Sequence, residues 1–232
     1  MLDFTPWDSM LKRYVNDDGQ VDYAAWQSAS DQELNTWLES LHVTELSTLE
    51  RDEAIAFLIN LYNALTIRQV LQQYPLASIR PTFLGMPNWL AFLHFFTKSV
   101  YRLKGQSLSL NNIEHGLLRE RFQEPRIHFA LVCASVGCPG LRAAAYEPEQ
   151  LDEQLAADAH RFIHNDDKVR YDAARSTLYC SKIFQWYKAD FLTKAASIPD
   201  YISQYRPELD LPNRVTVEFL PYSWALNQRT SS

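Results

Sequence analysis

One short stretch of the chain, RIHFALVCASVGCPGL (residues 126–141), contains a histidine and two of the three cysteines. A cysteine becomes a useful nucleophile when a histidine, a positive group or a helix N-terminus stabilises its thiolate. On one straight strand the side chains of His128 and Cys133 would point to opposite faces, because five residues separate them. Cys138 would meet His128 only if the turn folded back. We place Cys133 before Cys138 as the candidate nucleophile because it ends the expected strand.

Three other interpretations of this stretch remain open. Cys133 is a small apolar core residue in the first, as most free cysteines are. In the second, Cys133 and Cys138 form a disulfide across the turn, which requires an oxidising compartment. In the third, a zinc ion is bound by His115, His128 and both cysteines, although the spacing of the cysteines is not that of a zinc knuckle. We expect neither a metal nor another cofactor.

The segment NNIEHGLLR supplies a second set of chemically useful side chains. On a helix His115 and Arg119 share a face, while Glu114 points about 100° away. A histidine base with an orienting carboxylate follows the logic of catalytic triads. An exposed helix with ion pairs on its solvent side is the commoner arrangement of such residues.

Two asparagines lie in the apolar segment FLINLYNAL. An unpaired amide buried in a helix costs about 1–3 kcal/mol. We therefore expect Asn60 or Asn63 to make a side-chain hydrogen bond to backbone outside its own helix. The alternative is that both asparagines line a polar cleft. The nearby Tyr62, and Trp186 with Tyr187, are interpreted as core residues.

The elements that must position these residues are helices mixed with short strands. The hydrophobic pattern predicts a central, buried helix over residues 51–74. It should pack on a small mixed or antiparallel sheet that contains residues 126–133. Other elements are predicted as helices over 109–122, 147–165 and 183–191, hairpins over 99–110 and 168–181, and a strand over 214–224. This mixture indicates one helix-rich α+β domain over residues 1–232, with a frayed tail at 228–232.

Composition narrows the functional class. Hydrophobic residues make up 47% of the chain and charged residues 22%, as in ordinary globular proteins. The formal net charge of -6 argues against a nucleic-acid-binding protein. We expect no transmembrane segment, because no run of eighteen apolar residues exists. The beginning of the chain has no signal-peptide pattern. The protein is expected to be soluble, and cytoplasmic, or periplasmic or secreted if a signal peptide was removed.

Five segments, in family order, resemble the domain-of-unknown-function family 547, which occurs in bacterial proteins and at the C-terminal end of plant leucine-zipper proteins. The resemblance covers residues 7–227. It is carried by the segments FLINLYNALTIRQVL, SLNNIEHGLLR, PRIHFALVCASVGCPGLR, SKIFQWYKADF and FLPYSWALN. The hallmark residues of the family correspond here to Asn63, Glu114, His115, Arg119, His128, Cys133 and Cys138.

The resemblance implies chemistry only by residue type. A Glu-His-Cys set is similar to that of papain-like or NlpC/P60-like thiol hydrolases with a rearranged order of elements. One feature departs from the rearranged pattern, in which a long helix starts at the cysteine. In this chain the sequence CASVGCPGLRAAA has a proline and glycines close behind the cysteines.

Two functions follow as hypotheses. The first is a cysteine-dependent hydrolase or acyl transferase that acts on an amide, peptide or ester. Cys133 would be its nucleophile, His115 or His128 its base and Glu114 the orienting carboxylate, with Arg119 contacting an anion. We expect a histidine, preferably His115, within hydrogen-bond reach of Cys133 and Glu114 on its far side. The second hypothesis is a non-catalytic protein-binding or scaffolding domain with a structural polar cluster and an apolar groove.

Overall fold

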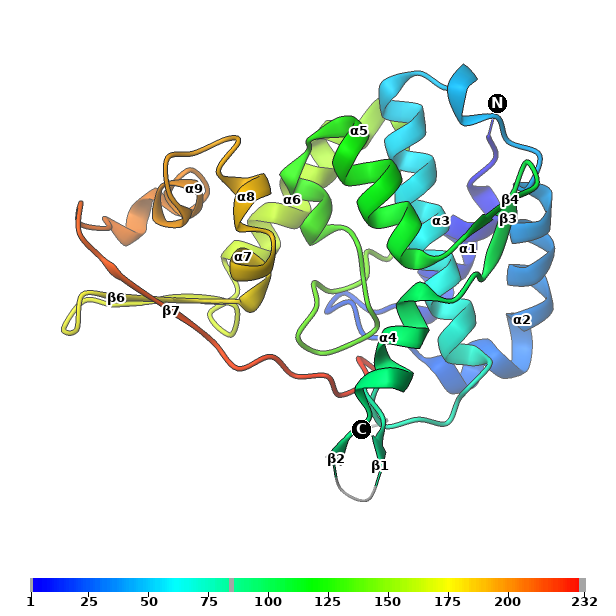
Figure 1. Ribbon diagram of the computed structural model, residues 1–232, viewed down its shortest axis with the longest axis horizontal. Helices are drawn as coiled ribbons and strands as arrows, with labels where there is room; N and C mark the ends of the chain where they lie inside the picture. The colour runs from blue at the N-terminus through cyan, green and yellow to red at the C-terminus, as the bar shows by residue number, and fades with distance from the viewer. Residues whose placement is uncertain (1, 84–85, 230–232) are drawn as a thin grey trace.

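The helix α3 (Arg51–Leu71) is the core helix of the protein (Figure 1). The computed structural model describes residues 2–83 and 86–229. Seventeen of the 21 residues of α3 are buried, and a capping box formed by Glu50 and Glu53 begins the helix. The buried helix predicted over residues 51–74 is confirmed, and it ends three residues early, at Leu71.

By length and composition alone, α3 is also apolar enough to cross a membrane. However, 94% of its apolar window is buried inside the protein, as is usual for the core helix of a globular fold. Two helices, α1 (Thr5–Tyr14) and α2 (Tyr23–Ser40), pack against each other, and α2 also packs on α3. At the contact between α1 and α2 the ring of Trp7 stacks on Trp37, with centroids 5.6 Å apart.

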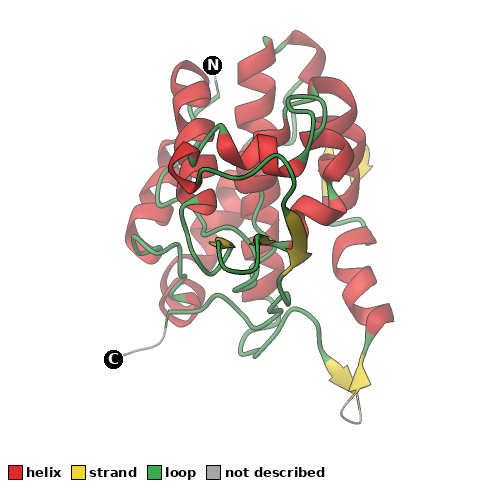
Figure 2. Cartoon of the chain, turned by 90° about the vertical axis from the view of Figure 1, so that its left-hand side faces the viewer, coloured by secondary structure: helices red, strands yellow, loops and turns green. Residues whose placement is uncertain are grey.

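The strands are short and form separate small sheets (Figure 2). Strands β5 and β6 are antiparallel and β6 and β7 are parallel, while the other strands form two antiparallel pairs. The strands are β1 (Thr82–Phe83), β2 (Met86–Pro87), β3 (Tyr101–Leu103), β4 (Gln106–Leu108), β5 (Val169–Asp172), β6 (Thr177–Cys180) and β7 (Thr216–Phe219). Both predicted hairpins and the predicted last strand are confirmed, and the fold is α+β.

The strand predicted over residues 126–133 is wrong. Pro125–Phe129 forms a short 3-10 helix, η3, and the chain continues as an irregular loop, residues 130–141, which we call the cysteine loop. The side chain of Asn63 binds the backbone of this loop where a neighbouring strand would have done so. Helix α3 therefore packs on an irregular segment and not on a sheet.

The remaining helices surround this centre. The helix predicted over 109–122 is present, but residues 112–119 within it have the wide hydrogen bonding of a π-helix. The helix predicted over 183–191 is divided at Tyr187. The helices not yet named are η1 (Leu46–Thr48), α4 (Trp89–Thr97), η2 (Asn112–Arg119), α5 (Glu120–Phe122), η4 (Pro148–Gln150), α6 (Leu151–Ile163), α7 (Lys182–Trp186), α8 (Lys188–Phe191), α9 (Ile198–Ser203) and η5 (Pro207–Leu209).

Buried apolar side chains form two clusters that share elements. The larger cluster is built on α1, α2 and α3, and the smaller one joins the end of α6 to α7, α8 and α9. Helix η3 contributes Ile127 to the larger cluster and Phe129 to the smaller one. Helix α6 likewise contributes Leu155 to one and Phe162 to the other. The two clusters are therefore joined through η3 and α6.

After β7 the chain runs back across the molecule to the side of the β1–β2 hairpin (Figure 1). We call residues 222–229 the return segment. Its backbone pairs with the cysteine loop, where the Val136 amide donates to the Ala225 carbonyl at 2.8 Å. Residues 228–229, which were expected to fray, pair with Val21. Residues 230–232 of the predicted frayed tail lie outside the described residues.

Candidate functional site

A cleft of about 590 Å³ lies where the π-helix η2, the cysteine loop, α4, α7 and the return segment meet. Polar side chains from separate parts of the chain form one part of its lining: Tyr62, Glu114, His115, His128, Cys133 and Cys138. Apolar and aromatic side chains form the rest, including Phe92, Leu93, Trp186, Tyr222 and Trp224. Such a mixture is typical of sites that bind small molecules or substrates. Trp186, expected in the core, is 46% exposed and lines this cleft.

Cys133 and Cys138 form a disulfide, with their Cα atoms 6.2 Å apart. This is one of the alternatives that the sequence left open. The third cysteine, Cys180, is free and buried in β6. Burial raises the pKa of the Cys180 thiol to about 12. The chemistry available to a sulfur in the cleft therefore belongs to the Cys133–Cys138 pair.

The two sulfur atoms of this pair have different hydrogen-bond partners. Cys138 Sγ accepts from the backbone amide of Cys133 at 3.0 Å and from the Tyr222 hydroxyl at 3.1 Å. Cys133 Sγ lies 3.1 Å from the Ser135 hydroxyl and 3.4 Å from that of Tyr222. A Cβ atom at Gly137 would come within 2.7 Å of the Tyr222 ring, so only glycine allows this approach.

The histidine predicted to hydrogen-bond Cys133 does not do so. Among the described residues neither sulfur has a hydrogen bond to a histidine, because both candidate imidazoles are held by other groups. His128 Nε2 is 2.7 Å from Asp190 Oδ2, and its ring stacks on that of Tyr187 with centroids 3.7 Å apart. Burial lowers the pKa of His128, outweighing the opposite effect of Asp190, so the neutral imidazole is favoured.

Asp190 connects His128 to a second pair, Arg119 and His115. The Arg119 guanidinium donates to both Asp190 oxygens, at 2.6 and 2.9 Å. Its Nη1 is 2.7 Å from His115 Nδ1. A guanidinium can only donate, so His115 Nδ1 accepts and the neutral ring carries its proton on Nε2. Burial alone would raise the pKa of Asp190, but the hydrogen bonds from His128 and Arg119 hold it well below its usual range.

Glu114 does not orient a histidine, which corrects the predicted role of this residue. Its buried carboxylate accepts hydrogen bonds from Tyr62 at 3.1 Å and from Tyr187 at 2.5 Å. Burial and the Glu114 charge both raise the pKa values of the two tyrosines, which keeps them protonated as donors. The carboxylate that holds a histidine is Asp190. Sequence reasoning missed it, although it lies in the quoted segment SKIFQWYKADF.

Two consecutive residues of the π-helix face the same cleft. In an α-helix Glu114 and His115 would point about 100° apart. Helix η2 has i→i+5 hydrogen bonding, and both side chains line the cleft. The helix is fixed at its beginning by Asn112, whose Oδ1 accepts from the Ser109 amide and hydroxyl at 3.0 and 2.7 Å.

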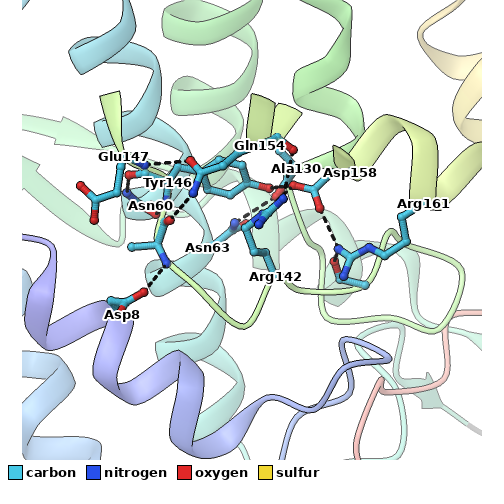
Figure 3. A network of polar contacts seen from close by, with 12 residues as sticks. Asp8, Asn60, Asn63, Ala130, Arg142, Tyr146, Glu147, Gln154, Asp158 and Arg161 are labelled. Carbon is cyan, nitrogen blue, oxygen red and sulfur yellow. Dashed lines mark hydrogen bonds and ion pairs between the residues drawn. The ribbon is translucent and has the colours of Figure 1, made fainter. Parts of the chain in front are cut away.

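The predicted role of the α3 asparagines is confirmed for both residues. Asn63 Nδ2 donates to the Ala130 carbonyl at 3.0 Å, and its Oδ1 accepts from the Val132 amide at 2.9 Å. Asn60 makes the same pair of bonds to the amide and carbonyl of Tyr146. Figure 3 shows both amides reaching from α3 to neighbouring backbone. Asn63 thus fixes the backbone immediately before Cys133, a residue that lines the cleft.

Among residues 2–83 and 86–229, no group of three or more His, Cys, Asp or Glu side chains is arranged as metal ligands. The disulfide also uses the two sulfur atoms that the zinc alternative would need. We therefore consider the cleft as a site for protein side-chain chemistry. Its reactive groups are the sulfur pair, the His128–Asp190 pair and His115.

Comparison with known proteins supports the resemblance noted in the sequence. A protein-family model described as "Protein of unknown function, DUF547" matches residues 46–163. No curated protein and no solved structure matches the chain. The matched region contains α3, η2 and the cysteine loop, and so most of the polar side chains of the cleft. With half of its length matched, this chain belongs to the DUF547 family.

Proposed function

We propose that the protein is a cysteine-dependent hydrolase or acyl transferase whose active centre is the cleft. The observation that carries the proposal is that Cys133 lines the same cleft as a buried histidine held by a carboxylate, the His128–Asp190 pair. Reduction of the Cys133–Cys138 disulfide produces the reactive form. The substrate is an amide, peptide or ester with an apolar group beside the carbonyl.

In this proposal Cys133, the two histidines and Asp190 have defined tasks. Hydrogen bonding of Nε2–H to Asp190 leaves His128 Nδ1 unprotonated, so it can accept the thiol proton of Cys133, directly or through one water. The thiolate then attacks the substrate carbonyl, and the leaving amine or alcohol takes the proton back from His128. His115, with its proton on Nε2, donates a hydrogen bond to the substrate. Water or a second acceptor finally attacks the thioester.

The apolar part of the cleft defines what accompanies the reacting carbonyl. Trp186 packs on Tyr222 with ring centroids 4.8 Å apart, and Phe92 meets Trp224 at 4.6 Å. These four rings come from α4, α7 and the return segment, and they form one connected aromatic cluster that lines the cleft. Aromatic walls favour an acyl chain or an apolar amino-acid side chain over a strongly charged group.

The proposal is tested with acyl esters and peptide amides that carry apolar groups and a chromogenic leaving group. We expect turnover only after reduction, and at least about a hundredfold loss in Cys133→Ala. Cys180→Ala is the matched control, because Cys180 is a free, buried cysteine that does not line the cleft. An electrophilic probe should label Cys133 of the reduced protein before Cys180. Equal turnover by Cys133→Ala and the parent protein would overturn the assignment.

A second candidate, a non-catalytic protein-binding domain, is favoured by exposed apolar side chains beside and along the cleft. Four apolar side chains on β2 and α4 are more than half exposed: Met86, Trp89, Leu90 and Leu93. Exposed apolar groups gathered on one hairpin and helix are typical of interaction surfaces. This candidate predicts that Cys133→Ala retains the binding function of the domain in full.

A further inference from the structure

The disulfide lies at a surface that a ligand can reach, unlike a disulfide that only braces a core. Cys133 and Cys138 are 9% and 8% exposed, and both line the cleft. The disulfide encloses only four residues between its cysteines, and such a short ring stabilises a fold less than a long one does. The location of this bond in an aromatic cleft therefore suggests a chemical function.

The surroundings of the two sulfurs distinguish an attacked atom from a leaving atom. Two donors point at Cys138 Sγ, the Cys133 amide at 3.0 Å and the Tyr222 hydroxyl at 3.1 Å. Hydrogen bonds to a thiolate stabilise it and make the sulfur a better leaving group. Cys133 Sγ has no backbone donor among residues 2–83 and 86–229; the Ser135 hydroxyl lies 3.1 Å from it, and its contact to Tyr222 is longer, 3.4 Å. Attack is therefore favoured at Cys133, with Cys138 leaving.

We propose that the Cys133–Cys138 disulfide is a redox centre that exchanges with thiols carrying an aromatic or aliphatic group. A substrate thiolate attacks Cys133 Sγ, the bond between the cysteines breaks, and its electron pair leaves on Cys138 Sγ. A second substrate thiolate attacks the substrate sulfur of the resulting mixed disulfide and releases Cys133. Two substrate thiols become one disulfide, and their two protons end on the protein dithiol. A disulfide of a different thiol reoxidises the pair by the same steps in reverse and is itself reduced to two thiols, so electrons pass from one thiol to another disulfide.

The walls of the cleft define the class of thiol. Phe92, Leu93, Trp186 and Trp224 give the approach to the sulfurs an apolar character. A thiol with an adjacent apolar group buries that group when its sulfur reaches Cys133, whereas a small polar thiol gains nothing from the walls. The same chemistry is present in a free aromatic thiol and in a cysteine that follows an apolar residue in a peptide.

The test measures how fast the oxidised protein is reduced by different thiols. Phenylethanethiol and mercaptoethanol are compared at equal thiolate concentration, with alkylation and mass spectrometry of the peptide that contains both cysteines. We expect phenylethanethiol to be at least about tenfold faster. A cysteine peptide with a neighbouring Phe, compared with one with a neighbouring Ser, shows whether peptide thiols are also accepted.

The role of the leaving sulfur is tested by Tyr222→Phe, which removes the hydroxyl and retains the ring. Reduction by both thiols should slow about tenfold, the factor expected for one hydrogen bond to a charged group. Ser135→Ala is the matched control, because the Ser135 hydroxyl contacts Cys133 and not Cys138. Equal rates for the two thiols together with no effect of Tyr222→Phe would show a purely structural disulfide and overturn the proposal.

This inference goes beyond the hydrolase proposal, and the two can fail separately. The exchange assay starts from the oxidised protein and contains no acyl substrate. The hydrolase assay starts from the reduced protein and contains no exchanging thiol. Selective exchange without acyl turnover would support the redox centre and contradict the hydrolase proposal. Acyl turnover without selective exchange would support the hydrolase and refute the redox centre.

Discussion

Asn63 and Val132 are joined by a buried hydrogen bond, in which the Val132 amide donates to Asn63 Oδ1 at 2.9 Å. Together with the bond from Asn63 to the Ala130 carbonyl, it attaches the cysteine loop to α3. Asn63→Ala should lower the free energy of unfolding by about 2–4 kcal/mol, since two buried backbone groups lose their partners. It should also speed alkylation of the reduced cysteines. Urea unfolding and alkylation rates measure the two effects.

Asn60→Ala is the matched control for this prediction. Asn60 makes an equivalent pair of bonds from the same helix, but to Tyr146. The loss of stability should be similar, while the alkylation rate of Cys133 and Cys138 should not change. An equal rise in alkylation in both variants would mean that general loosening, and not the link to the cysteine loop, controls the thiols.

The two carboxylates of the site, Asp190 and Glu114, are expected to differ in importance. Asp190 holds His128 and Arg119, whereas both oxygens of Glu114 are engaged by tyrosines. Asp190→Asn should reduce acyl turnover by at least about tenfold, because the carboxylate no longer stabilises the imidazolium. Glu114→Gln should have a smaller effect. The value of kcat/KM for both variants, measured at one pH, tests this prediction. A larger loss in Glu114→Gln than in Asp190→Asn would contradict the assignment of Asp190 as the carboxylate that supports the base.

The stability of the protein should fall in mild acid. Burial lowers the pKa of His128 from 6.5, so below that pH the unfolded chain takes up a proton that the folded protein does not. This contribution is complete above pH 6.5 and decreases as the pH falls. Asp190, whose pKa is also lowered, extends the loss to more acidic pH. His128→Asn should flatten the dependence between about pH 5 and 6.5 in urea-unfolding measurements. If the slope of stability against pH is unchanged in His128→Asn, groups other than His128 cause the pH dependence.

The apolar wall of the cleft can be tested without disturbing the fold. Leu93 is 54% exposed and lines the cleft, so Leu93→Glu should change the free energy of unfolding by less than about 0.5 kcal/mol. Its affinity for an apolar fluorescent dye should fall about tenfold. Leu90→Glu is the control, because Leu90 lies on the same helix, is 82% exposed and does not line the cleft. Equal losses in both variants would place the dye outside the cleft.

Local signals were sufficient for the elements that depend on neighbours in sequence. The apolar run of α3 and the β3–β4 hairpin, whose turn contains Gly105 with a φ of 82°, were predicted from such signals. The segment 126–133 shows the limit of this reasoning. Its apolar content correctly indicates burial, but its conformation is set by Asn63, which is 67 residues away from Ala130. Apolar runs of this length do not distinguish a strand from other buried backbone.

The residues of the site could likewise be predicted only in part from the sequence. Residue types and the family resemblance identified His115, His128 and both cysteines, which all line the cleft. The partners of these residues were not predictable. Asp190 is 62 residues from His128 and Tyr222 is 84 residues from Cys138, and neither distance leaves a periodic signal in the sequence. An aspartate in YKADF and a tyrosine in FLPYSW are ordinary residues until the fold brings them to the site.

The position of Tyr222 in the return segment has a consequence for the order of events during synthesis. It is translated 89 residues after Cys133, with which it makes contact, and lies outside residues 46–163, which the family model matches. At about 5–20 residues per second, this separation corresponds to roughly 4–18 s. During that interval the two cysteines have no tyrosine hydroxyl beside them, and the wall formed by Tyr222 and Trp224 is absent. A nascent chain therefore carries both sulfurs before the part of the cleft formed by the return segment exists.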